Sequence, residues 1–182
     1  VELALWAPDG PRHEQIEYAC DAADEAWLGK LANRGGIAHL LRTSPVAGGG
    51  LALGLLRRLR ALYRARQSQT DIFHINWLQN ALPLYGMGAK AVITVLGTDF
   101  KLLKLPGMVA AVRQVMKTNT CILAPNASWM RQSLQDWFGD VATISPVNFG
   151  IDERWYALQC SPPAPVNHWL CVLRVTSDKI GE

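Results

Sequence analysis

The stretch VITVLGTDFKLL, from Val92 to Leu103, begins like a buried β-strand and then stops at a glycine, a hydroxyl and a carboxylate. Four of its first five residues are apolar and three of those are β-branched, which favours an extended backbone. A short apolar run bounded by a turn residue is typical of an inner strand of a parallel sheet. We therefore predict that Gly97, Thr98 and Asp99 lie at the carboxyl end of such a strand.

Comparable apolar runs recur along the chain and alternate with segments whose apolar residues have helical spacing. The predicted strands cover residues 1–7, 36–43, 71–77, 89–96, 120–124 and 141–145. The predicted helices cover residues 15–33, 51–66, a segment after Pro106-Gly107 and residues 126–139, with a loop at 44–50. This alternation indicates an α/β fold, namely a Rossmann-like three-layer domain with a mostly parallel sheet and right-handed crossovers.

Composition narrows the possible classes of protein. The 182 residues are 49% hydrophobic and 18% charged, which suits a packed core, and the net charge of +3 is too small to suggest nucleic-acid binding. The four cysteines form no Cys-x-x-Cys pair and no Cys/His cluster with zinc-ligand spacing, so we expect free thiols and no metal. The sequence has no leader-like segment and no apolar run of about 20 residues, so we expect a cytoplasmic protein.

A proline-rich segment divides the chain. Residues 158–167, LQCSPPAPVN, favour an extended spacer because their prolines exclude helix. The following HWLCVLRV, at 168–175, has the pattern of a new strand. We therefore expect one domain over residues 1–157, a linker over 158–167 and, in 168–182, the first strand of a second domain that continues past Glu182.

Ligands of open parallel sheets gather at the carboxyl ends of the strands. Gly97 would let a ligand approach the backbone, Thr98 could donate a hydrogen bond, and Asp99 could accept from a sugar hydroxyl or hold a catalytic proton. The candidate loops at these strand ends are Pro8-Asp9-Gly10, Asn76-Trp77, Gly97-Thr98-Asp99 and Pro125-Asn126. The candidate ligand-binding residues in them are Gly10, Asn76, Gly97, Thr98, Asp99 and Asn126. The seven tryptophans are too scattered along the sequence to suggest a stacking platform.

Structural alternatives exist for the polar candidates and their neighbours. Asp99 could simply cap the helix that follows its strand, and Asn126 is a good N-cap for the predicted helix at 126–139. His74 lies inside a predicted strand, either as a satisfied core histidine or at the floor of a cleft. The glycines at 48–50 could cradle a phosphate, but they lack the Lys-Ser/Thr of a P-loop and fit a flexible loop better.

The predicted helix at 51–66 carries five arginines and no acid. Arg57, Arg60 and Arg64 lie roughly opposite its leucine face, where they could contact anionic lipid at a membrane surface. The alternative is a helix face that is simply solvated.

Several segments, taken in order, resemble the amino-terminal half of a family 4 glycosyltransferase of the two-domain GT-B fold. DIFHINW (71–77) is similar to the family's D-x-x-H-x-x strand, and VITVLGTD (92–99) to its V-x-T-x-H-G-x-D segment. The run ILAPNASWMRQSLQDWFGDVATISPVNFGIDERWY resembles the family's S-x-x-x-x-x-x-L helix through I-x-N-G-[IV]-D-x-x-x-[FY]. HWLCVLRVTSDKIGE is similar to its G-R-L-x-x-x-K-G opening of the second domain.

The resemblance implies a transferase that moves a sugar from a nucleotide-sugar donor to a polysaccharide or glycolipid acceptor, with retention and without metal or other cofactor. Arg174 and Lys179 match the basic pair that neutralises the donor diphosphate. Asp99 would orient or deprotonate the acceptor hydroxyl, with Gly97 and Thr98 beside it. The implied setting is cytoplasmic, at the inner membrane face. Because most of the donor site would lie in the second domain, we expect no turnover from these 182 residues alone.

The sequence departs from the family pattern at four places. Leu96 replaces the frequent histidine, Phe149 interrupts N-G-[IV]-D, Asn126 stands where serine is common, and Leu173 replaces glycine. Two other classes therefore stay open. One is a stand-alone, non-catalytic α/β binding module, and the other is a response-regulator-like or flavodoxin-like domain.

Overall fold

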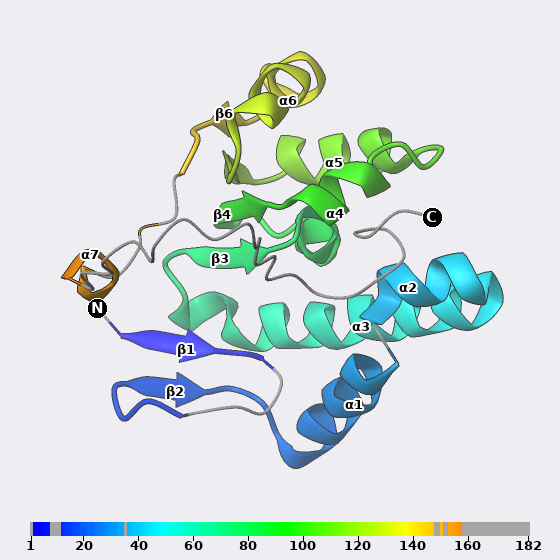
Figure 1. Ribbon diagram of the computed structural model, residues 1–182, viewed down its shortest axis with the longest axis vertical. Coiled ribbons are helices and arrows are strands. Elements are labelled where there is room, and N and C mark those ends of the chain that lie inside the picture. Colours follow the sequence, from blue (N-terminus) through cyan, green and yellow to red (C-terminus); the bar gives the residue numbers. More distant parts are fainter. Residues whose placement is uncertain (1, 8–11, 35, 148–149, 151–152, 158–182) are drawn as a thin grey trace, which may run out of the picture. The chain divides into compact units, whose positions relative to one another are not determined.

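The computed structural model describes residues 2–7, 12–34, 36–147, 150 and 153–157 (Figure 1). The chain divides into two compact units, Val1–Asn148 and Phe149–Glu182. In the second unit the structure describes the short helix α7 (Arg154–Ala157). The predicted linker and the strand after it lie outside the described residues, so the predicted domain boundaries stay predictions.

A four-stranded parallel sheet forms the centre of the first unit. It consists of β3 (Phe73–Asn76), β4 (Lys90–Val95), β5 (Thr120–Pro125) and β6 (Thr143–Ile144), hydrogen-bonded in that order. Ile93 of β4 and Leu123 of β5 are register partners, so their buried side chains lie side by side on the same face of the sheet. The prediction of a Rossmann-like α/β fold with a mostly parallel sheet is thereby confirmed.

Helices cover the face of this sheet on which Ile93 lies. They include η2 (Leu78–Leu84), α4 (Gly97–Leu102), α5 (Met108–Lys117), η3 (Ser128–Met130) and α6 (Arg131–Phe138). Leu78, Val112 and Phe138 lie fully buried in the single core cluster that these helices form with the sheet. Arg113 of α5 also donates to both carboxylate oxygens of Asp140, in the turn after α6, at 2.7 and 2.6 Å.

The N-terminal part forms a separate parallel pair, β1 (Leu3–Leu5) with β2 (Ile16–Tyr18). The helix predicted from residue 15 therefore starts later, as α1 (Ala22–Asn33). Its N-cap is Asp21, whose carboxylate accepts from the Asp24 amide at 2.7 Å. Glu17, which falls within the predicted helix, lies instead in β2.

Residues 36–66 are where the prediction was wrong. The predicted strand at 36–43 is helix α2 (Gly36–Thr43), and the predicted loop at 44–50 is the first two turns of α3 (Pro45–Arg66). Pro45 suits the first turn of a helix because the missing amide would have no partner there. A short 3-10 turn, η1 (Gln67–Gln69), then leads to β3.

Gly48 explains why a run of three glycines is helical here. A Cβ added at Gly48 would come within 2.6 Å of the Leu41 amide nitrogen, so only glycine lets α2 and α3 approach this closely. At Gly49 and Gly50 an added Cβ would meet nothing within 4 Å. The close packing of α2 on α3 therefore compensates for the poor helix propensity of this segment. The glycines at 48–50 therefore do not form the loop that a phosphate-binding role would need, and this alternative is wrong.

This contact predicts opposite effects at adjacent glycines. Gly48→Ala should lower the free energy of unfolding by about 2 kcal/mol, because backbone atoms of α2 would have to move. Gly49→Ala, the matched control, should raise it by about 1 kcal/mol, because it only removes the entropy cost of a helical glycine. Urea titration of both variants measures the difference. Equal effects would mean that α2 does not pack on Gly48.

Candidate functional site

The carboxyl ends of β3, β4 and β5 lie side by side at one edge of the sheet. The amide of Asn126 donates to the Val95 carbonyl at 3.1 Å, which places it beside the start of α4. We call this edge the carboxyl rim and define it by Asn76, Trp77, Gly97, Thr98, Asn126 and Trp129. It therefore joins four of the predicted site residues with two tryptophans that the sequence analysis set aside.

Asp99 lies beneath the rim, in the first turn of α4. Its side chain is only 2% exposed. One carboxylate oxygen accepts from the Leu96 amide at 2.7 Å and the other from the Leu78 amide at 2.8 Å. The first bond caps α4, as the structural alternative expects, and the second fastens η2 to the end of β4. Gln79 adds a further link, because its side-chain amide donates to the Asp99 carbonyl at 2.8 Å.

Burial raises the pKa of the Asp99 carboxyl, and the amides of Leu78 and Leu96 oppose that shift by stabilising the carboxylate. Because both oxygens already accept main-chain hydrogen bonds, a substrate could reach the carboxylate only if η2 moved. The catalytic role of Asp99 stays a prediction, and in the described geometry this residue holds the rim together.

Trp77 occupies an unusual position directly after β3. Its φ of 72° is positive, which is rare for a bulky side chain. Hydrogen bonds fix this conformation on both sides: its amide donates to the Thr94 carbonyl at 3.1 Å, and its carbonyl accepts from the Asn80 amide at 2.9 Å. The indole is 51% exposed. The backbone is therefore held in a strained state that presents a large aromatic side chain to solvent at the rim.

Asn126 carries the one buried side-chain oxygen or nitrogen, among the residues that the structure describes, that lacks a hydrogen-bond partner. The atom is Oδ1. Asn126 is not the N-cap that we predicted, because the residue that caps η3 is Ala127 and α6 begins only at Arg131. A buried acceptor without a donor costs about 1–3 kcal/mol, so its presence at a strand end points to a missing partner.

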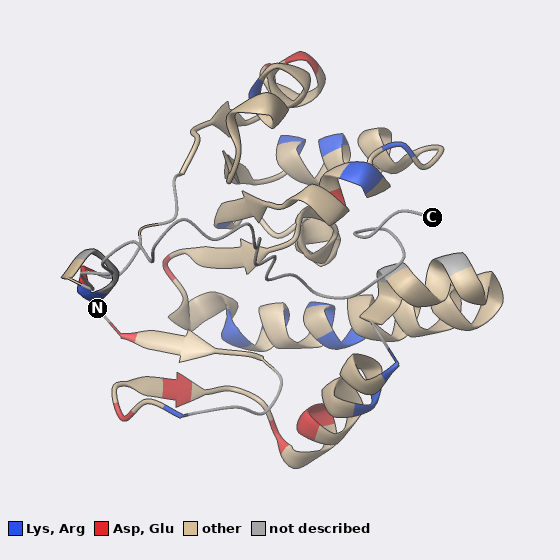
Figure 2. Cartoon of the chain, in the orientation of Figure 1, with Lys and Arg blue, Asp and Glu red and all other residues tan. Residues whose placement is uncertain are grey.

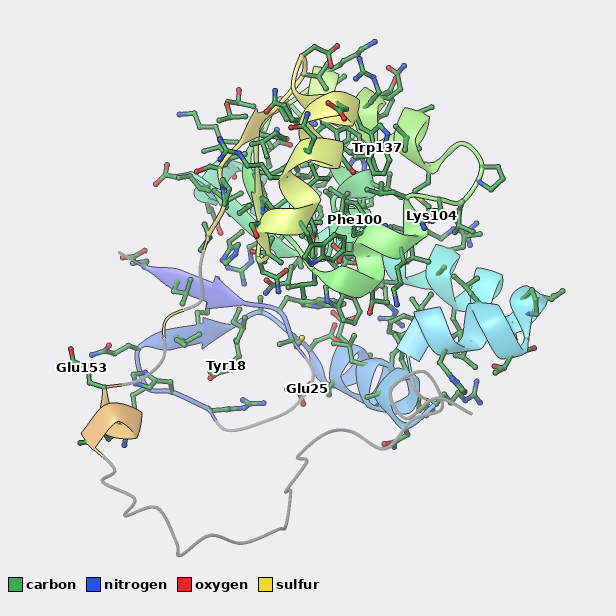
Figure 3. The ribbon with its side chains drawn as sticks, turned by 45° about the horizontal axis from the view of Figure 1, so that its top comes forward. Tyr18, Glu25, Phe100, Lys104, Trp137 and Glu153 are labelled. Carbon is green, nitrogen blue, oxygen red and sulfur yellow. The ribbon has the colours of Figure 1, made fainter. Side chains whose placement is uncertain are left out.

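A second exposed indole, Trp129, lies on the η3 side of the rim. Its ring meets Phe100 of α4 edge-on, with 4.9 Å between centroids, and Phe100 also packs on Trp137 of α6 at 5.6 Å (Figure 3). Trp129 is thus supported from below while 59% of its surface stays exposed. Next to it an open surface hollow is lined by Ser128, Arg131, Gln132 and Gln135.

The other predicted site residues lie apart from the rim or outside the described part. Gly10, Arg174 and Lys179 are not among the described residues. His74 is exposed rather than a core histidine, and its Nε2 lies 3.0 Å from the Thr94 hydroxyl. Within the described part of the chain, no group of three or more His, Cys, Asp or Glu side chains could hold a metal ion.

Sequence reasoning placed Trp77 in a candidate strand-end loop without giving it a role, and it missed Trp129. The available signal was their position, because Trp77 is the last residue of the predicted strand at 71–77 and Trp129 follows the predicted strand at 120–124 by five residues. Spacing along the chain hid this signal, since residues 52 positions apart meet at one edge only when β3 and β5 flank β4.

Comparison of the chain with protein-family models, with curated proteins and with solved structures finds no match. The family resemblance is therefore carried by the quoted motifs alone.

The geometry around Asp99 predicts a structural effect that its neighbour does not share. Asp99→Ala should lower the free energy of unfolding by about 3 kcal/mol, because two buried amides lose their acceptor. Thr98→Ala should change it by less than about 0.5 kcal/mol, because the Thr98 side chain is exposed. Chemical denaturation compares the two. A loss below about 1 kcal/mol for Asp99→Ala would refute the role as a clamp.

The raised pKa of Asp99 also predicts how that effect changes with pH. A carboxyl whose pKa is higher in the folded state binds protons more readily when folded, so its contribution to stability is greatest in acid. That contribution falls as pH rises from the unfolded pKa of about 4 through the folded value. The stability difference between wild type and Asp99→Ala should therefore shrink from about pH 4 to about pH 7. A difference that grows over this range would contradict the raised pKa.

Proposed function

We propose that this chain is the acceptor-binding domain of a nucleotide-sugar-dependent glycosyltransferase, and that the carboxyl rim holds the glycan acceptor. The observation that carries the proposal is the unpartnered, buried Oδ1 of Asn126 in the same carboxyl rim as an exposed hydroxyl and two exposed indoles. A glycan supplies what these groups lack, since its hydroxyls donate to a carbonyl oxygen and its C–H faces stack on an aromatic ring.

The polar groups of the rim favour a neutral ligand. Asn76 and Asn126 offer amides and Thr98 a hydroxyl, and all three can exchange hydrogen bonds with alcohol groups. The nearby hollow adds the two glutamines of α6, Gln132 and Gln135, as further amides. Amides, a hydroxyl and two exposed indoles match an oligosaccharide better than a phosphorylated ligand, which selects clustered cations, because the rim and the hollow together contain one cation, Arg131.

In the proposed reaction an acceptor hydroxyl oxygen bonds to the anomeric carbon of the donor sugar, and its proton passes to a phosphate oxygen of the departing diphosphate. The bond from that carbon to the diphosphate breaks, and the nucleoside diphosphate leaves with the electron pair. Arg174 and Lys179 are the residues proposed to neutralise the leaving group. Asp99 has its place as a positioning residue, because its bonds to Leu78 and Leu96 set where Thr98 and Trp77 present the acceptor. A cytoplasmic setting at a membrane belongs to the same proposal.

The occupied oxygens of Asp99 also favour a second candidate, a binding module without catalysis. Such a module needs the rim but no accessible base. The two candidates share the glycan and differ in turnover, so binding and transfer have to be measured separately.

Glycan binding at the rim is tested by saturation-transfer NMR with neutral oligosaccharides, using gluco- and manno-hexaoses as probes. Trp77→Ala should weaken binding about tenfold through loss of stacking. Asn126→Leu should weaken it about fivefold while raising the free energy of unfolding by about 1 kcal/mol, because it removes the unpartnered oxygen. A residue with a purely structural role would instead lose stability on substitution.

Tyr85→Ala is the matched control. Tyr85 is 55% exposed but lies at the opposite edge of the sheet, where the next residue, Gly86, donates to the Thr118 hydroxyl. Binding that falls equally in Tyr85→Ala and Trp77→Ala, or no binding of any probe, would overturn the proposal. Transfer of labelled sugar by the complete gene product then separates the enzyme from the module.

A further inference from the structure

Helix α3 exposes a line of four side chains along its outer surface. Val46, Leu53, Arg57 and Arg64 follow one another at intervals of seven, four and seven residues, so they lie on one side of an α-helix. Val46 is 90% exposed and Leu53 is 49% exposed, and both arginines are exposed too. We call these four residues the outer line. It is apolar in the N-terminal half of the helix and cationic in the C-terminal half.

The opposite side of α3 is fixed in the core. Gly48, Leu59 and Tyr63 are buried, and the Tyr63 hydroxyl donates to the Asn80 carbonyl at 3.1 Å. The outer line therefore cannot turn inward without unpacking the domain. The fold therefore keeps the outer line exposed. Val46 and Leu53 on it do not contribute to the core, so their apolar character needs another explanation.

The five arginines of α3 fall into two groups. Arg58 pairs with Asp24, Arg66 pairs with Glu17, and Arg60 donates to the carbonyls of Pro83 and Tyr85 in and after η2. Arg60 is thus committed to backbone oxygens and drops out of the lipid contact predicted for it. Arg57 and Arg64 have no partner among the described residues, so their charges remain available to an external anion.

Acids beside α3 pair with arginines that lie outside the outer line: Asp24 of α1 pairs with Arg58, and Glu17 of β2 pairs with Arg66. The segments α2, η1 and η2 contain neither Asp nor Glu, and α3 itself has none. Figure 2 shows no red on the described parts of α2 and α3. The charged residues of the outer line itself are therefore two cations, Arg57 and Arg64.

We propose that the outer line docks on an anionic lipid surface. Val46 and Leu53 enter the boundary between headgroups and acyl chains, while Arg57 and Arg64 pair with lipid phosphates. The contact is peripheral, since none of the helices in the described part is long and apolar enough to cross a membrane. The phosphates of a nucleic acid could bind the two arginines, but they offer no apolar surface to the two exposed aliphatic side chains. An anionic lipid surface therefore matches all four residues of the outer line better.

The experiment is co-sedimentation of the protein with phosphatidylcholine vesicles that contain about 30% phosphatidylserine. The wild type should bind these vesicles, bind pure phosphatidylcholine vesicles far less, and be released by about 1 M salt. The double variant Arg57→Gln/Arg64→Gln should bind about thirtyfold more weakly. The double variant Val46→Ser/Leu53→Ser should also bind more weakly while keeping its salt dependence, because insertion is lost and attraction remains.

Lys101→Gln/Lys104→Gln is the matched control, because it removes two exposed cations that lie on and just after α4. It should bind like the wild type, and thermal melts should show that all three double variants stay folded. Equal weakening in the lysine and arginine variants would reduce the effect to net charge and overturn the proposal. Tighter binding to a short DNA duplex than to the vesicles, or no loss with Val46→Ser/Leu53→Ser, would overturn it as well.

Discussion

One buried carboxylate determines how the rim of the sheet is built. A parallel strand that ends at a ligand site leaves main-chain amides without partners, and buried amides cannot stay unpaired. Asp99 resolves this for two chain segments at once, because it accepts from Leu96 at the end of β4 and from Leu78 at the start of η2. The carboxylate needs no ion pair for this, since oriented amides stabilise it despite the desolvation that raises its pKa. The positions of Trp77 and Thr98 therefore depend on a residue that no ligand touches in this arrangement.

Two unfavourable features lie directly above that clamp. Trp77 holds a backbone conformation that is rare outside glycine, and Asn126 buries an oxygen without a donor. Each costs free energy of the order of 1–3 kcal/mol, which a domain tolerates only when its core over-determines the local geometry. The fully buried layer of Leu78, Ile93 and Leu123 directly below supplies that constraint. Both defects occur at one edge of the sheet, and this co-location supports a binding role more strongly than either defect alone.

The sequence predicts an element of this structure well when its hydrophobic pattern is long and fits only one kind of secondary structure. Strands β4 and β5 and helix α5 follow from long apolar runs and a Pro-Gly break, and the described elements match them closely. The segment 36–50 fails because an eight-residue apolar run fits helix or strand, and because glycine normally signals a loop. Its helical state depends on the close approach of Gly48 to Leu41. This is a tertiary contact, which helix propensities of single residues cannot predict. At the rim, strand-end logic finds Asn76, Thr98 and Asn126 but cannot say which acceptor stays unpaired or that Asp99 turns inward.

The arginines of α3 also show that the sequence alone does not reveal which charged side chains have partners in the fold. As a string of residues they form one basic block, and helical spacing alone placed Arg57, Arg60 and Arg64 together. The fold separates them, because Arg60 reaches the carbonyls around η2 while Arg57 and Arg64 remain on the outer line. An arginine that satisfies backbone oxygens stabilises a loop, and one without a partner contributes to the external field. The net charge therefore says little about the binding partners of this chain. The positions of the unpartnered arginines on α3 indicate which surface would bind an anionic partner.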